Sequence, residues 1–392
     1  EIVAYRCESN RLFILDGQTG ALKVTITTPT ILPGGTTPAI ADLSNDGFGE
    51  IVIVGNDRRL RCYSHTGQLK WFSFLLVGYD QRYRCSSPSI ADLNQNGLPE
   101  IVIGNQVFNG QNGQLIASGG AAGSAGEHPL RNLTGFSFNA SVPMDVLPDG
   151  FCNHCQGLEI VAGNRVYSVN LATGQVQTVV SAPPGYSDGY TSIADFDGDG
   201  DLDAIVQGQK NGQNTIYVWD LQTPTILREF ALYNNWPEGA SRANVADLDG
   251  DGRPDISFVS YPELYALNND FNVMWTRDVF DVSAVTCSSV FDFCGDGSSE
   301  VVYRGQEYLQ IFDGATGAVI WQDECFSATH IEYPLVLDVD GDGQTEIVIQ
   351  CGYTDVGQGR VIAYEAVGAP GISSRRVWNQ HGYHNTNIND DL

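Results

Sequence analysis

The chain has 392 residues, of which 42% are hydrophobic, and it carries a formal net charge of −27. This apolar content is enough for a buried core, whereas the excess of acids excludes the basic surface that nucleic-acid binding requires. No apolar run reaches the ~18–20 residues that span a bilayer, so we expect no membrane insertion by this segment. The chain begins at Glu1 with no recognisable signal peptide, so we expect any targeting signal to lie outside it.

One acidic pattern of nine residues, Asp-x-Asp/Asn-x-Asp-Gly-x-x-Asp/Glu, recurs along the chain. Its copies begin, in chain order, at Asp42, Asp92, Asp145, Asp195, Asp247, Asp292 and Asp338, at intervals of 45 to 53 residues. Repeats of this length are typical of propeller blades. Short apolar runs precede the loops, as at residues 191–194, and β-branched runs follow them, as at residues 347–349. We therefore expect each loop to join two strands.

Three copies are complete and favour calcium. Ca²⁺ takes six to eight oxygen ligands, and alternate residues of a tight loop direct their carboxylates to one point, while glycine at position 6 permits the sharp turn. Magnesium is disfavoured because it keeps its waters and rarely sits in an all-protein cage. Counting position 7, which would supply a backbone carbonyl, the expected ligands are Asp195, Asp197, Asp199, Asp201 and Asp203; Asp247, Asp249, Asp251, Arg253 and Asp255; and Asp338, Asp340, Asp342, Gln344 and Glu346.

The other copies have lost ligands. Their candidate ligands are Asp42, Ser44, Asp46 and Glu50; Asp92, Asn94, Asn96 and Glu100; and Asp292, Asp296 and Glu300. In the copy that begins at Asp145, the closing acid is delayed to Glu159. The alternative for any single copy is a surface turn of Asp, Asn and Gly that needs no metal. Across the seven copies, 23 of the 47 acids fall on ligand positions, so several bound ions would contribute folding energy as well as function.

Two further strands follow each loop region. The third often ends in a glycine turn, as at residues 16–20, and the fourth often carries a tryptophan, as at Trp71 and Trp321. We expect these tryptophans to pack between blades rather than to form a ligand site. Four strands per repeat with no helical pattern predict an all-β fold, a β-propeller of four-stranded blades with the calcium loops between the first and second strands.

We expect one propeller domain over residues 1–392. The expected repeats are about 1–30, 31–80, 81–120, 121–182, 183–232, 233–280, 281–325 and 326–370, with a closing segment at 371–392. Eight blades are favoured because Glu1 begins a post-loop strand whose loop is missing, and residues 387–391 mimic its first positions. Both termini would then share one blade and remove exposed edge strands. Seven blades with an extra strand set is the alternative.

The loops and their flanking strands resemble the FG-GAP repeat family (integrin α-type, also VCBS-type) over about residues 1–366. The resemblance implies a propeller, calcium in the loops, and adhesion or ligand binding outside the cell. The weakened loops and the insertion before Glu159 depart from the family pattern. Residues 375–384 also resemble a tail found in large surface proteins of gliding or adhesive bacteria.

Nine cysteines favour an oxidising compartment. The pair Cys152 and Cys155 fits a local disulfide, bridges to neighbouring segments, or half of a zinc knuckle. Bridges between neighbouring blades are conceivable for Cys62 with Cys85 and for Cys325 with Cys351, although sequence alone does not fix connectivity. The sequons at Asn132 and Asn139 fit glycosylation of an extracellular protein.

No catalytic motif stands outside the loops. The expected function is an extracellular, calcium-stabilised module for binding or adhesion, with a protein or glycan ligand. The insertion at residues 118–144 is the expected contact surface. A polysaccharide-degrading enzyme and a structural subunit of a surface filament are the alternatives. Further partners would be other copies of the chain or further domains of a longer one.

Overall fold

The computed structural model describes residues 1–5, 9–32, 36–76, 87–120, 141–233, 239–281, 283–284, 286–327, 333–352, 359–366 and 372–374. Every regular element in these ranges is a strand. None of them holds a helix with the length and hydropathy needed to cross a bilayer. The predictions about Asn132, Asn139, most of the insertion and the closing residues 375–392 lie outside the described residues.

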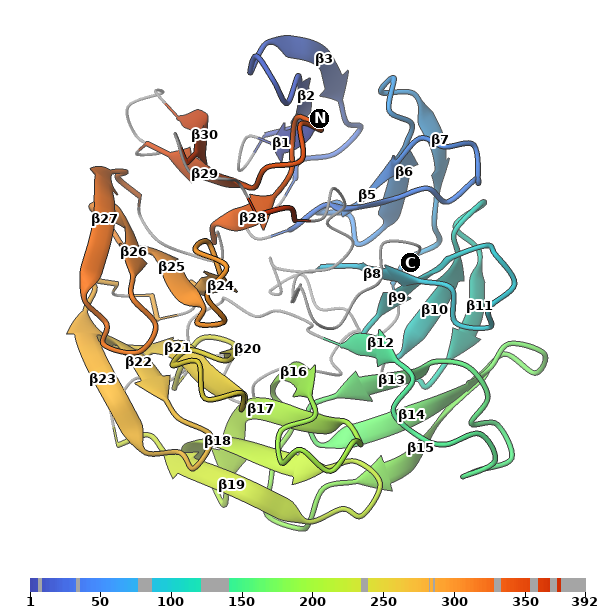
Figure 1. The fold of residues 1–392 in the computed structure, drawn as a ribbon. Coiled ribbons are helices and arrows are strands. Elements are labelled where there is room, and N and C mark those ends of the chain that lie inside the picture. Colours follow the sequence, from blue (N-terminus) through green and yellow to red (C-terminus); the bar gives the residue numbers. More distant parts are fainter. Residues whose placement is uncertain are drawn as a thin grey trace.

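The strands follow one another in groups of three or four (Figure 1). The first groups are β1 (Ile2–Tyr5), β2 (Arg11–Leu15) and β3 (Leu22–Thr27), then β4 (Ala39–Ala41), β5 (Glu50–Val54), β6 (Leu60–Tyr63) and β7 (Leu69–Phe72). Next come β8 (Ser89–Ala91), β9 (Glu100–Ile103), β10 (Gln106–Asn109) and β11 (Leu115–Ser118), then β12 (Val142–Met144), β13 (Glu159–Ala162), β14 (Arg165–Asn170) and β15 (Gln175–Ser181).

The second half repeats this order. It comprises β16 (Tyr190–Ala194), β17 (Asp203–Lys210), β18 (Gln213–Asp220) and β19 (Ile226–Ala231), then β20 (Asn244–Ala246), β21 (Asp255–Ser260), β22 (Glu263–Leu267) and β23 (Val273–Asp278). The last groups are β24 (Ser289–Phe291), β25 (Glu300–Arg304), β26 (Tyr308–Phe312) and β27 (Val319–Glu324), then β28 (Leu335–Leu337), β29 (Glu346–Cys351) and β30 (Arg360–Glu365).

Within each group, consecutive strands pair antiparallel and the groups stand around a central axis like propeller blades (Figure 1). The groups β8–β11 and β12–β15 are joined into one eight-stranded sheet, but only through a single parallel bridge between Ser118 and Gln175. In the groups from β4 onward, the first strand is the innermost, and the acidic loop joins it to the second strand (Figure 1).

The ring closes between the first and last groups. The backbone nitrogen of Glu1 donates a hydrogen bond of 3.2 Å to the carbonyl oxygen of Val339. Ile2 packs on an apolar cluster that includes Leu337 and Val348. In space, strand β1 therefore comes next after the loop that follows β28. The sequence predicts this position, because Glu1 resembles the acid that closes a loop.

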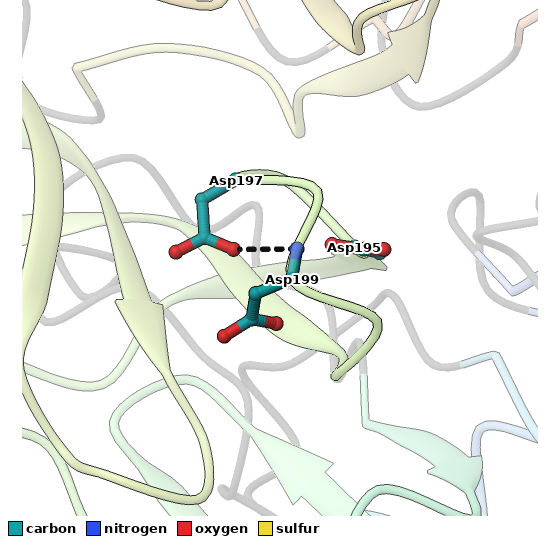
Figure 2. Close-up of side chains that lie close together, drawn as sticks. All are labelled: Asp195, Asp197 and Asp199. Atoms are coloured by element: carbon teal, nitrogen blue, oxygen red, sulfur yellow. Dashed lines mark hydrogen bonds between the residues drawn. The ribbon is translucent and has the colours of Figure 1, made fainter.

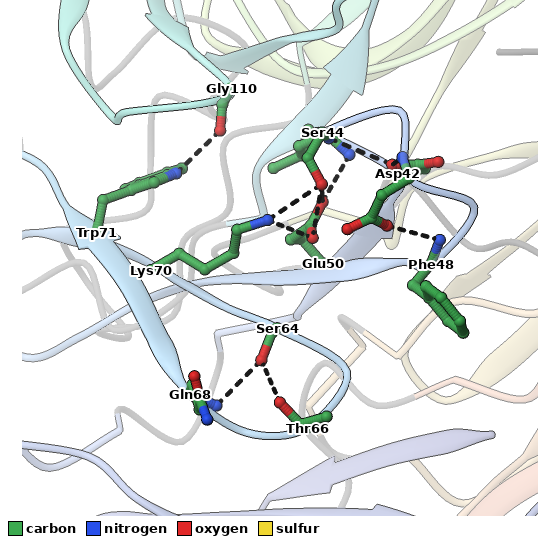
Figure 3. Close-up of polar contacts among 12 residues, drawn as sticks. Asp42, Ser44, Phe48, Glu50, Ser64, Thr66, Gln68, Lys70, Trp71 and Gly110 are labelled. Carbon is green, nitrogen blue, oxygen red and sulfur yellow. Dashed lines mark hydrogen bonds and ion pairs between the residues drawn. The ribbon is translucent and has the colours of Figure 1, made fainter.

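The core lies between neighbouring groups. The second strands are buried on both faces, so β5 and β9 read as continuous apolar runs rather than alternating ones. Side chains such as Val52 and Ile101 meet in one cluster between two groups. The Trp71 indole donates a hydrogen bond of 2.9 Å to the carbonyl of Gly110 on the next group (Figure 3), and the ring of Trp321 packs edge-on against Tyr364 of the following one. Packing of these tryptophans between groups is confirmed.

Two of the predicted disulfides are present. Cys152 bonds to Cys155 inside the distorted loop, and Cys325 after β27 bonds to Cys351 on β29, which ties two groups together. The Cys62–Cys85 bridge is wrong, because Cys62 is a free thiol. Its side chain is fully buried on β6 and packs within the apolar cluster between two groups. Cys85 lies outside the described residues.

Candidate metal centres

The first aspartate of each loop organises the turn. In the loop 195–203, the Asp195 carboxylate accepts hydrogen bonds from the backbone amides of Gly198 (2.8 Å) and Gly200 (3.1 Å). The carboxylate of Asp197 accepts one of 3.2 Å from the amide of Asp199 (Figure 2). Gly200 has a φ of +96°, a conformation that an L-residue adopts only with strain. These bonds wind the backbone so that alternate carboxylates stay on one side.

The acid that closes each loop is buried and accepts a hydrogen bond from a backbone amide of its own loop. Asp203 Oδ2 accepts a hydrogen bond of 2.9 Å from the amide of Phe196, the second loop residue. The same bond to the second residue is made by Glu50, Glu100, Asp255, Glu300 and Glu346. Glu159 makes the equivalent bonds to Val146 and Leu147, although its loop is longer. The closing acid therefore holds the loop to the start of the second strand in all seven copies.

The three complete loops are the places where carboxylates converge in the described residues. Their ligand oxygens lie within 4.8 Å of one another in three groups, which are Asp195, Asp197 and Asp199; Asp247, Asp249 and Asp251; and Asp338, Asp340 and Glu346. An all-oxygen donor set of this density fits a hard divalent cation such as Ca²⁺.

Several predicted ligands stand outside these groups. Asp255 is held by two backbone amides, that of Leu248 at 3.1 Å and that of Asn269 at 2.9 Å. The guanidinium of Arg253 donates to the side chain of Asn269, and the side-chain amide of Gln344 donates to Glu365 at 2.7 Å. The backbone carbonyl ligands of Asp201, Arg253 and Gln344, and the side chains of Asp203 and Asp342, remain predictions.

The electrostatics of the closing acids favour a cation. Burial raises the pKa of Asp203, Asp255 and Glu346 to about 7, and the neighbouring loop aspartates add to the rise. Buried carboxylates of like charge repel one another unless a counter-charge lies between them. Glu346 carries the clearest sign of this, since its Oε1 is buried and receives no hydrogen bond within the described part of the chain. Glu346 belongs to the same group as Asp338 and Asp340, and a divalent cation bound there would supply the missing counter-charge.

Two of the eroded loops satisfy the same oxygen with protein donors. In the loop 92–100 the side-chain amide of Asn94 donates a hydrogen bond of 3.3 Å to Glu100 Oε1. In the loop 42–50 the ammonium of Lys70 lies 2.7 Å from Glu50 Oε1. Lys70 is absent from the predicted site, because it stands 20 residues after the closing acid. In the sequence, the one sign of this contact is that Lys70 immediately precedes the tryptophan of the fourth strand.

In two pairs of adjacent groups, a backbone hydrogen bond joins the neighbouring acidic loops. The amide of Ser299, just before the closing acid Glu300, donates a hydrogen bond of 2.8 Å to the carbonyl of Asp247 on the preceding group. The amide of Leu158 donates one of 3.1 Å to Leu93 in the same manner. A change in one loop therefore acts directly on the next.

The fold and these loops define a β-propeller with acidic loop repeats. Residues 195–257, which span two of the complete loops, match the FG-GAP-like repeat family. This segment therefore resembles FG-GAP-like repeats, and the chain as a whole has a β-propeller fold. No curated protein matches its sequence significantly.

Solved structures share the whole architecture at low identity. The biofilm matrix protein Bap1 of V. cholerae is 15% identical with a TM-score of 0.69, over 98% of this chain and 86% of Bap1. BamB from Moraxella catarrhalis is 12% identical with a TM-score of 0.56, over 93% of both chains. A quinohemoprotein alcohol dehydrogenase from Pseudomonas putida HK5 is 11% identical with a TM-score of 0.56, over 95% of this chain and 74% of the enzyme. These likenesses establish the fold alone.

Proposed function

We propose that the protein is an extracellular binding or adhesion module whose blades are stiffened by calcium, with a protein or glycan as its ligand. The observation that carries the proposal is the convergence of three carboxylates in each complete loop, together with the buried Oε1 of Glu346, which no described residue hydrogen-bonds. Calcium would be held by Asp195, Asp197 and Asp199 in one loop and by their counterparts in the other two. In the proposal, its chemistry is structural: it neutralises the loops and fixes the face they form.

Several features support a location outside the cell. Two disulfides are compatible with an oxidising compartment, and millimolar calcium outside cells suits sites of modest affinity. Bap1, which has a similar fold, is a biofilm matrix protein. We extend the proposal to eight blades, with the two termini sharing the first blade, because β1 to β3 make a group of three strands that follows the last loop in space.

The experiment is a glycan and matrix-polysaccharide array probed in calcium and in chelator. Binding that calcium supports, with no oligosaccharide released, is the expected result. The variant Asp249→Asn should weaken binding, while Glu324→Gln, a charge removal at an exposed position of β27, should not. Released oligosaccharides would instead identify a polysaccharide-degrading enzyme. Polymers in electron micrographs of the purified protein would identify a filament subunit.

A further inference from the structure

The loop 42–50 contains a positive charge supplied by the protein. Lys70 on β7 places its Nζ 2.7 Å from Glu50 Oε1 and 3.1 Å from Ser44 Oγ (Figure 3). The Glu50 side chain is 1% exposed and that of Lys70 is 32% exposed, so the carboxylate is shielded from water while the lysine remains partly exposed. A lysine amine ordinarily titrates near pH ~10.4, so the group that faces Glu50 is an ammonium at neutral pH.

In the complete loop 338–346, the same carboxylate oxygen has no such partner among the described residues. Glu50 Oε2 and Glu346 Oε2 each accept a hydrogen bond of 2.8 Å from the amide of the second loop residue. The two acids thus hold equivalent positions and differ only at Oε1. Glu346 Oε1 receives no hydrogen bond from the described residues, whereas Glu50 Oε1 receives the ammonium of Lys70.

Lys70 reaches the loop from a β-bulge that recurs in other groups. Leu69 pairs with Tyr63 and Trp71 pairs with Cys62, so Lys70 is an extra residue that bulges from the fourth strand. Five other groups have the bulge in the same register, directly after the first residue of the fourth strand. The bulged residues there are Lys23, Ile116, Leu227, Met274 and Ile320.

The second lysine in this series makes the same contact. Ile2 pairs with Leu15 as Ile51 pairs with Tyr63, which makes Glu1 the counterpart of Glu50. Lys23 Nζ lies 2.7 Å from Glu1 Oε1. The groups whose complete loops begin at Asp195 and Asp247 have the uncharged Leu227 and Met274 at the bulge instead.

We propose that the ammonium of Lys70 takes the role of the metal ion in the loop 42–50, so that this loop is permanently neutralised and binds no calcium. Lys23 forms the equivalent ion pair with Glu1. The inference rests on the proposed function in one respect, since it takes the complete loops to be calcium sites. It predicts a simple rule: a lysine at the bulge marks a metal-independent blade, and an apolar residue there leaves the carboxylates free for an ion.

A lysine ammonium and a metal ion exclude each other at this position for two chemical reasons. An ammonium hydrogen-bonded to Glu50 Oε1 occupies the oxygen that a metal would need, and its charge repels a divalent cation at this distance. Ser44 offers a hydroxyl in place of the carboxylate that complete loops have at this position, so a single positive charge suffices. In the loop 42–50, the missing third-position acid and the bulge lysine therefore act together.

The test exchanges the bulge residues. Lys70→Met introduces the side chain found at Met274, and Ser44→Asp restores the missing carboxylate. Metal analysis after dialysis against calcium should find one more bound ion per chain in the Lys70→Met/Ser44→Asp variant than in the wild type. Met274→Lys should lose one ion. An unchanged calcium count in Lys70→Met/Ser44→Asp, or a calcium ion in wild type that Glu50→Gln removes, would overturn the inference.

A second measurement separates this inference from the proposed function. In chelator, Lys70→Met should melt several degrees below the wild type, because Glu50 is left buried without its partner. Adding Glu50→Gln should restore most of the loss, since the two residues are coupled. Equal melting of Lys70→Met and wild type in chelator would refute the role of Lys70. A wild-type chain that binds no calcium would refute the proposed function, and these chelator melts would still decide the role of Lys70.

Discussion

The backbone amide of Ser299 donates a hydrogen bond of 2.8 Å to the carbonyl oxygen of Asp247. The first residue of one acidic loop is thereby joined to the residue before the closing acid of the next. An ion that fixes the loop 247–255 would also hold the loop 292–300, which lacks a carboxylate at its third position. Under the proposed function, calcium in the complete loops would thus also stabilise neighbouring blades whose own loops are eroded.

Removing one carboxylate from a complete loop should remove one ion. Asp249→Asn takes away a member of the group formed with Asp247 and Asp251. A site that is saturated at a hundred times its dissociation constant contributes about 2.7 kcal/mol to stability, so the variant should unfold at lower temperature in excess calcium. In chelator it should be no less stable than the wild type, because a repelling charge is gone. Calorimetry in both conditions checks this, with Glu324→Gln as the control, and a lower melting temperature in chelator would contradict it.

Two glycines at equivalent turns allow the cost of backbone strain to be measured separately from the cost of overpacking. Gly20 and Gly317 both have φ of +66°, but a Cβ on Gly20 meets nothing within 4 Å, whereas one on Gly317 lies 2.5 Å from the Trp275 ring. Gly20→Ala should cost about 1–2 kcal/mol, the strain of a left-handed residue. Gly317→Ala should cost a further ~1–3 kcal/mol from overpacking. Denaturant unfolding of the two variants measures the difference, and equal losses would show that Trp275 yields freely.

The tryptophan on the fourth strand should contribute to stability through the hydrogen bond of its N–H group as well as through the apolar area that it buries. Trp275 Nε1 donates a hydrogen bond of 2.6 Å to the carbonyl of Gly314 on the next group. Trp275→Phe leaves that buried carbonyl without its donor, which costs about 1–3 kcal/mol. Val273→Thr, at an exposed position of the same strand, is the control. A Phe variant as stable as this control would contradict the hydrogen bond's role.

The disulfide between Cys325 and Cys351 should matter more than the one between Cys152 and Cys155. It closes a chain segment with a sequence separation of 26 and joins two groups, whereas the other has a separation of 3 within one loop. Chain-entropy arguments give about 3 kcal/mol for a closed loop of this length. Cys325→Ser/Cys351→Ser should therefore lower the melting temperature clearly, and Cys152→Ser/Cys155→Ser only slightly. The reverse order would show that the distorted loop is the weaker point of the ring.

The repeat pattern was sufficient to predict the all-β propeller and the three loops where carboxylates converge. Each loop is a local sequence whose hydrogen bonds, such as those of Asp195 to Gly198 and Gly200, lie within nine residues. The role of Lys70 could not be predicted, because it depends on a bulge that exists only when two strands are paired in a particular register. The free thiol of Cys62 could not be predicted for a related reason. In a strand that is buried on both faces, a run of apolar residues does not reveal which face each side chain occupies.

Metal content and thermal unfolding measured together across a chelator titration test the central claim most directly. If the complete loops are structural calcium sites, the purified protein should contain calcium, release it as chelator is added, and melt at progressively lower temperature as it does so. Restoring calcium should restore the melting temperature, and magnesium at equal concentration should not. A chain that contains no calcium and melts identically with and without chelator would contradict the account.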